Sequence, residues 1–162
     1  MRNKQKGFSL IELLIVVAII LIIAAIAIPN LLRSKMAANE SSAVGSMRTI
    51  NTAEVSYVTA YPNQGFSVDL PSLGGVAPCV VATTAAACLI DNTLALATGA
   101  ATAKSGYFFT YVAGAAPPTT YAITGLPATA GSTGQRGFFT DQTGVIRYAI
   151  SGAATVASSP IQ

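Results

Sequence analysis

The hydrophobic pattern divides the chain into an apolar segment, an amphipathic segment and a mixed C-terminal part. Residues 8–28 are apolar except for Ser9 and Glu12. A helix of this length spans about 30 Å at ~1.5 Å per residue, which is the thickness of a bilayer core. Three basic side chains and no acidic ones precede it, at Arg2, Lys4 and Lys6. This charge bias predicts a cytoplasmic N-terminus, with the chain beyond the segment outside the membrane.

After Pro29 the pattern becomes amphipathic, as expected of a helix with one face against a folded domain. Apolar positions recur at helical spacing, at Leu32, Met36, Ala43, Met47, Ile50 and Tyr57. Polar residues that we expect at the surface are Arg33, Lys35, Asn39, Glu40, Arg48, Asn51 and Glu54. The helix is predicted to end at Ala60, because Tyr61 precedes Pro62 and a residue before proline disfavours helical geometry. Pro29 lacks an amide hydrogen and is expected to kink or loosen the helix.

The remaining chain predicts a connecting segment followed by a sheet. Residues 61–104 are rich in Ala, Thr, Gly and Pro and predict a long loop with little regular structure. Beyond Ser105, four segments have the aromatic and β-branched composition of strands: Tyr107–Val112, Thr119–Thr124, Gly137–Thr140 and Val145–Ala149. Four consecutive strands favour an antiparallel meander with one face against the helix, which gives an α+β fold.

Composition narrows the possible functions. The chain has 162 residues, enough for one modest domain and a membrane segment, and it contains no histidine. Metal sites built on imidazole and triads with a histidine base are therefore excluded. The six acidic residues are widely separated and no phosphate-binding glycine loop is present, so we predict no enzyme, cofactor or metal site. Asp141 is the only acid after Asp91, which favours a turn residue over a calcium ligand.

The charge balance argues against a nucleic-acid site. The chain has nine basic and six acidic side chains, but three of the basic ones precede Gly7. Loss of residues 1–7 would leave six of each sign, so no basic patch predicts nucleic-acid binding.

Cys79 and Cys88 lie in the part that we place outside the membrane. In an oxidising compartment this pair favours one disulfide that closes a short loop. A pair of free thiols is the alternative.

The junction Lys6-Gly7-Phe8-Ser9-Leu10-Ile11-Glu12 is the most specific pattern in the chain. A secretory signal peptide would explain the small residues of Ala25-Ile26-Ala27, but the apolar stretch exceeds an h-region of about 7–15 residues and contains an acid. A plain signal anchor that tolerates Glu12 near the interface is a second interpretation. The third is favoured: the junction resembles the processing site of type IV prepilins and pseudopilins through Glu12, and it is most similar to a type IVa major pilin.

The resemblance implies cleavage after Gly7 by an aspartyl prepilin peptidase, followed by N-methylation of the new amino terminus at Phe8. It also implies the pilin fold, in which a long helix packs on the β-meander. The expected organisation is a leader, a transmembrane assembly helix, an amphipathic helix, a connecting loop with the disulfide, and a sheet head with its tail: residues 1–7, 8–28, 29–60, 61–104 and 105–162.

The function implied by the resemblance is a structural subunit that polymerises through its N-terminal helix into an extracellular filament for adhesion, motility or DNA uptake. Implied partners are further copies of the chain, the prepilin peptidase and methyltransferase, an inner-membrane assembly platform, and membrane lipid before assembly. The subunit would wait in the inner membrane with its head in the periplasm. A pseudopilin of a type II secretion system, which forms a short periplasmic filament, is the alternative.

Glu12 needs a partner under this interpretation. A carboxylate within a membrane costs roughly 2.5–3.5 kcal/mol on insertion scales. Cleavage would create an ammonium group at Phe8, and methylation keeps that charge. The pair could form within one helix or between adjoining subunits. A pair between subunits would set their axial register, because a misplaced subunit leaves two buried charges unpaired.

Overall fold

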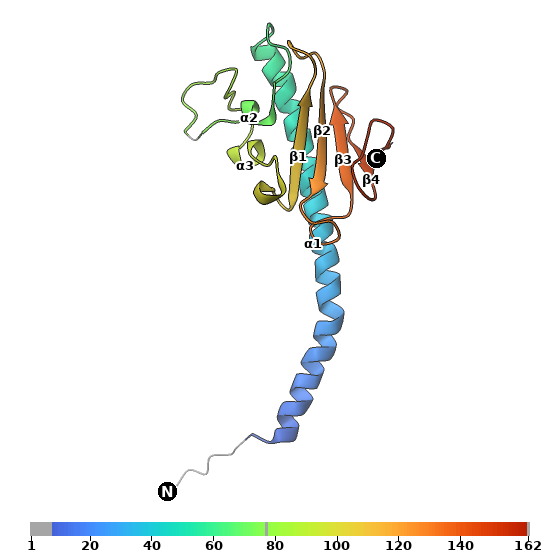
Figure 1. Cartoon of the computed structure of the whole chain (residues 1–162). Coiled ribbons are helices and arrows are strands. Elements are labelled where there is room, and N and C mark those ends of the chain that lie inside the picture. Colours follow the sequence, from blue (N-terminus) through green and yellow to red (C-terminus); the bar gives the residue numbers. More distant parts are fainter. Residues whose placement is uncertain (1–7, 77, 162) are drawn as a thin grey trace. The chain divides into compact units, whose positions relative to one another are not determined.

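A computed structural model of the protein describes residues 8–76 and 78–161 (Figure 1). The chain divides into two compact units, one ending at Lys35 and the other beginning at Met36. Helix α1, Leu10–Ala60, contributes to both units and ends at the predicted residue. Pro29 lies inside α1, and the kink expected there stays a prediction.

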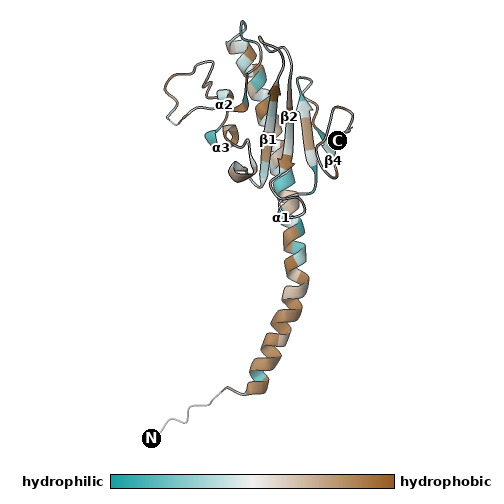
Figure 2. Ribbon diagram, in the orientation of Figure 1, coloured by the Kyte–Doolittle hydropathy of each residue, from teal (hydrophilic) through white to brown (hydrophobic). Residues whose placement is uncertain are grey.

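In the first unit, α1 is apolar on every side from Leu13 to Ile28 (Figure 2). Its large apolar side chains are exposed, from Leu10 to Leu32, and the helix is long and apolar enough to cross a membrane. A helix that is hydrophobic all round requires lipid or other apolar helices around it. The exposure of Leu32 shows that it does not belong to the buried face, contrary to the prediction.

The second unit carries an antiparallel sheet in the strand order β1-β2-β3-β4-β5. Its strands are Tyr107–Ala113, Tyr121–Pro127, Gly137–Asp141, Arg147–Ala149 and Ser159–Pro160. The first four confirm the predicted meander, with β2 and β4 each beginning two residues later than expected. The sequence did not predict β5, because its two residues, a serine and a proline, have no strand propensity.

The core of the second unit lies between α1 and one face of the sheet. Met47, Ile50 and Tyr57 of α1 are buried in one cluster with side chains from the strands, including Phe109, Ile123 and Phe138. In β1 the fully buried Tyr107 and Phe109 alternate with the half-buried Phe108 and the exposed Thr110, as expected of a strand with one face in the core. The predicted packing of helix on sheet is confirmed.

The segment between α1 and β1 is more ordered than the sequence predicted. It contains α2, Leu70–Leu73, α3, Asn92–Ala95, and the 3₁₀ turn η1, Ala100–Thr102. Asp69 and Asp91 cap the two short helices, each accepting a hydrogen bond at 2.9 Å from a backbone amide of the first turn. The segment also supplies core residues, namely Leu70, Leu73, Ala87, Ile90, Leu94, Ala95 and Ala97. It is therefore part of the folded second unit, which we call the head.

The predicted disulfide is confirmed: Cys79 and Cys88 are joined, with their Cα atoms 6.2 Å apart. Replacing both by serine is expected to lower the free energy of unfolding by about 2–3 kcal/mol, because the unfolded chain loses a short closed loop. Urea unfolding of the wild type and the double variant, each with and without reductant, measures this difference. A wild type whose stability is unchanged by reductant would contradict the expectation.

Candidate functional site

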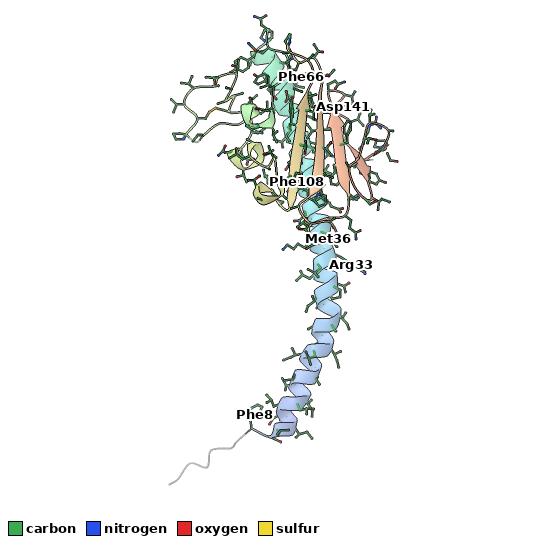
Figure 3. The ribbon with its side chains drawn as sticks, in the orientation of Figure 1. Phe8, Arg33, Met36, Phe66, Phe108 and Asp141 are labelled. Atoms are coloured by element: carbon green, nitrogen blue, oxygen red, sulfur yellow. A yellow bond between two sulfur atoms is a disulfide. The ribbon has the colours of Figure 1, made fainter. Side chains whose placement is uncertain are left out.

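Phe8 and Glu12 lie four residues apart at the N-terminal end of α1, and both are exposed. Phe8 precedes the helix and is exposed, and Figure 3 shows it at the beginning of α1. Helical hydrogen bonding begins where the amide of Leu13 donates to the carbonyl of Ser9 at 3.2 Å. Glu12 lies in the first turn, where the free amides of the helix favour a carboxylate. Gly7, the predicted cleavage residue, lies outside the described residues.

Glu12 has no basic partner within residues 8–76 and 78–161. The ion pairs there join Lys104 to Asp91 and Arg136 to Glu40. Glu12 is also the one charged residue between Phe8 and Ile28. Its carboxylate is thus set in an apolar surface, and no counter-charge lies beside it in the part of the chain that the structure describes.

Glu40 of α1 is buried and forms hydrogen bonds with the segment that connects β2 to β3. Its carboxylate accepts hydrogen bonds from the amides of Gln135 and Arg136, at 2.9 and 3.1 Å, and from Nε of Arg136 at 2.7 Å. The same guanidinium lies 5.7 Å from the ring centre of Phe138 and 5.6 Å from that of Tyr148. One ion pair therefore joins α1 to β3 and β4, and the prediction of Glu40 as a surface residue is wrong.

Acid is expected to weaken the head through Glu40. Burial alone raises the pKa of this carboxyl, but the donors from Gln135 and Arg136 outweigh burial and lower it. Because the pKa is lower in the folded state, the stabilisation is complete above the unfolded pKa of about 4.3 and is lost as the pH falls through the folded value. Urea midpoints from pH 6 to pH 3 should fall more steeply for the wild type than for Glu40→Gln. Parallel profiles would contradict this.

Glu54 is a second carboxylate of α1 that the sequence wrongly placed on the surface. It is fully buried and accepts hydrogen bonds from the amide of Ser67 at 3.0 Å and from its Oγ at 2.6 Å. The hydroxyl of Tyr111 in β1 donates to the carbonyl of Ser67 at 3.0 Å. Glu54 thus links α1, the segment before α2, and the sheet. Its spacing of four residues from Ile50 and three from Tyr57 put it on the apolar face, a signal that the sequence offered.

Asp141 behaves as a turn residue. Its side chain accepts a hydrogen bond from the amide of Thr143 at 2.9 Å, and its carbonyl accepts one from Gly144. Among the described residues no three acidic, cysteine or histidine side chains come together as a metal site.

Similarity to known proteins begins at the N-terminus. Residues 2–28 match the family described as Prokaryotic N-terminal methylation motif. The chain is 46% identical over 54 residues to the type IV major pilin protein PilA of Myxococcus xanthus, which covers 33% of the chain and 24% of that protein. It is 63% identical over 41 residues to the type IV wide pilus major component PilA4 of Thermus thermophilus, 25% of the chain and 30% of that protein.

The N-terminal segment of the chain carries the methylation motif of the type IV pilin family. The long α1 followed by a five-stranded antiparallel sheet is the pilin-like α+β fold.

The chain also shares 35% identity over 78 residues with the type II secretion system core protein G of Escherichia coli, 44% of the chain and 54% of that protein. The chain therefore spans about half the length of core protein G and a third or less of the two major pilins. No solved structure matches it.

Proposed function

We propose that this pilin is the structural subunit of a type IV pilus, which polymerises through the first half of α1 into an extracellular filament for adhesion, motility or DNA uptake. The observation that supports this most is the exposed apolar surface of α1, which carries one carboxylate and directly follows a methylation motif. In the membrane, lipid covers this surface. In the filament, copies of the same helix cover it.

Processing prepares the subunit for assembly. A prepilin peptidase cuts after Gly7, and the amine of Phe8 is methylated and keeps its positive charge. The basic side chains that orient the chain leave with residues 1–7, while the apolar helix remains. Cleavage thereby supplies the counter-charge that Glu12 lacks within the described residues.

Assembly then pairs the carboxylate of Glu12 with the amine of Phe8 in an adjoining subunit. At 4 Å two unit charges attract by about 4 kcal/mol at an effective dielectric constant of ~20, against about 1 kcal/mol in water. Removing one partner from a buried pair costs about 3–5 kcal/mol. The pair therefore selects the register in which every charge is matched.

A pseudopilin is the second candidate, and the similarity to core protein G favours it. Such a subunit would assemble by the same helix into a short periplasmic filament. The two candidates differ in where the filament is found.

Deletion of the gene, with complementation, tests the proposal. Electron microscopy of the deletion strain should show loss of sheared surface filaments, and complementation should restore them with this chain as the abundant component. Surface filaments that persist without the gene, together with loss of protein secretion, would show a pseudopilin instead.

A further inference from the structure

The second unit exposes a loop with apolar side chains that do not take part in its own core. We define the disulfide loop as Val76 and residues 78–88. Val76, Val80 and Val81 are 80%, 83% and 71% exposed. No residue between Asp69 and Asp91 is charged. A cluster of exposed apolar side chains on a folded head marks an interaction surface.

The disulfide loop is held in place by several bonds. Cys79 is joined to Cys88, and the hydroxyl of Tyr57 in α1 donates to the carbonyl of Thr84 at 2.8 Å. The amide of Cys88 donates to the carbonyl of Gly74, also at 2.8 Å. A loop fixed before it binds loses less conformational entropy on binding. The valines are thus presented in a preorganised form.

A concave apolar surface lies elsewhere on the same unit. We define the sheet groove as a groove of about 680 Å³ whose main apolar walls are Phe108, Leu126 and Ile150. Phe108 pairs with Leu126 across β1 and β2, on the face opposite the buried Tyr107 and Phe109. No lining residue of the groove is ionisable. The groove therefore suits an apolar, uncharged segment.

The two surfaces occupy different sides of the head. In Figure 1 the disulfide loop extends from α2 beyond the β1 edge of the sheet, whereas the groove crosses β1 and β2 and reaches the segment after β4. A contact between unlike surfaces of identical copies is heterologous, and such contacts build open filaments.

A residue of opposite charge lies near each surface along the chain, Asp69 before the disulfide loop and Arg147 before Ile150. Asp69 immediately precedes α2 and has no basic partner among the described residues. Arg147 lies on the outer face of the sheet, since it pairs with the half-buried Phe139 while its neighbour Tyr148 pairs with the buried Phe138. Arg147 donates to the carbonyl of Ser158 and has no carboxylate partner within the described residues. If the disulfide loop of one copy entered the sheet groove of another, these two charges of opposite sign would approach each other at the edge of the groove.

We propose that the disulfide loop of one subunit docks in the sheet groove of a neighbouring copy in the filament. Val80 and Val81 fill the groove against Phe108 and Ile150, and Asp69 approaches Arg147 at its rim. This inference rests on the proposed filament function and adds the contact between heads.

Photo-crosslinking in intact filaments tests the docking. A photoreactive amino acid replaces Val80 in the full chain, and sheared filaments are irradiated and digested. We expect adducts between position 80 and fragments that contain Leu126 or Ile150. As a control, the same probe at Val55, which is 65% exposed on α1, should give no adduct with those fragments.

A pair of introduced opposite charges distinguishes specific docking of the loop in the groove from chance proximity of the two surfaces. Ile150→Glu, at a position that is 74% exposed, should reduce the adduct yield at least tenfold without lowering the unfolding midpoint. Adding Val81→Lys should restore most of the yield, because the two new charges attract each other.

Adducts that map outside the groove, no adduct, or a yield unaffected by Ile150→Glu would overturn the docking proposal. Normal filaments in those experiments would leave the proposed function standing. Absence of filaments from the wild type would overturn both.

Discussion

Replacing Glu12 by valine is expected to abolish filament assembly while membrane insertion stays intact. Valine suits the apolar segment, so the helix still partitions into lipid. The amine of Phe8 would then be buried in the filament without its counter-charge, at a cost of about 3–5 kcal/mol. Since each 1.4 kcal/mol is tenfold, subunit association should weaken more than ~100-fold. The yield of sheared filaments, normalised to subunit in the membrane fraction, measures the effect.

Two further variants isolate the charge. Glu12→Gln keeps the size and polarity of the side chain but not its charge, and it should also fail to assemble. Leu13→Ile changes a neighbouring apolar residue and should assemble normally. Wild-type filament yield from Glu12→Val would refute the charge-pair mechanism.

Replacing Glu54 by alanine is expected to give the largest loss of stability in the head. The carboxylate is fully buried and accepts both hydrogen bonds from Ser67. Its removal leaves the buried amide of Ser67 without an acceptor, leaves the hydroxyl of Ser67 only the carbonyl of Asp69, and opens a cavity beside Tyr111 and the sheet. A buried unsatisfied donor costs about 1–3 kcal/mol and the cavity adds to this, so the free energy of unfolding should fall by about 3–5 kcal/mol.

Two control variants show whether the loss of stability comes from the buried carboxylate of Glu54. Glu54→Gln retains one carbonyl acceptor and should cost less than Glu54→Ala. Thr59→Ala removes an exposed hydroxyl bond to the carbonyl of Val55 on the same helix and should change stability by about 0.5 kcal/mol or less. Urea unfolding of the three variants gives the comparison, and equal losses for Glu54→Ala and Thr59→Ala would be incompatible with the burial of Glu54.

Local patterns in the sequence are sufficient to recognise the junction, the end of the helix and the first four strands. Gly7, Phe8 and Glu12 form a pattern at fixed spacing along the chain, so no tertiary contact is needed to recognise it. The end of α1 at Ala60 follows from Pro62 nearby, a local backbone effect. The first four strands were recognisable because aromatic and β-branched residues lie between turn signals.

Contacts between distant residues could not be predicted in the same way. The sequence predicts Glu40 and Glu54 at the surface because carboxylates are rarely buried without partners. Arg136, the partner of Glu40, lies 96 residues further along the chain, and no local pattern connects the two. For Glu54 the helical spacing indicated the apolar face, but not its partner Ser67. Residues 61–104 were underestimated for a related reason, since their small apolar residues gain their burial only from packing on α1 and the sheet.

The most direct test of the account is the intact mass of the subunit in purified surface filaments, with sequencing of its N-terminus. We expect a chain that begins at N-methylated Phe8 and retains Glu12 and the whole apolar helix. A filament subunit that keeps residues 1–7, or a mature chain that begins after Ala27 as signal peptidase would leave it, would contradict the account.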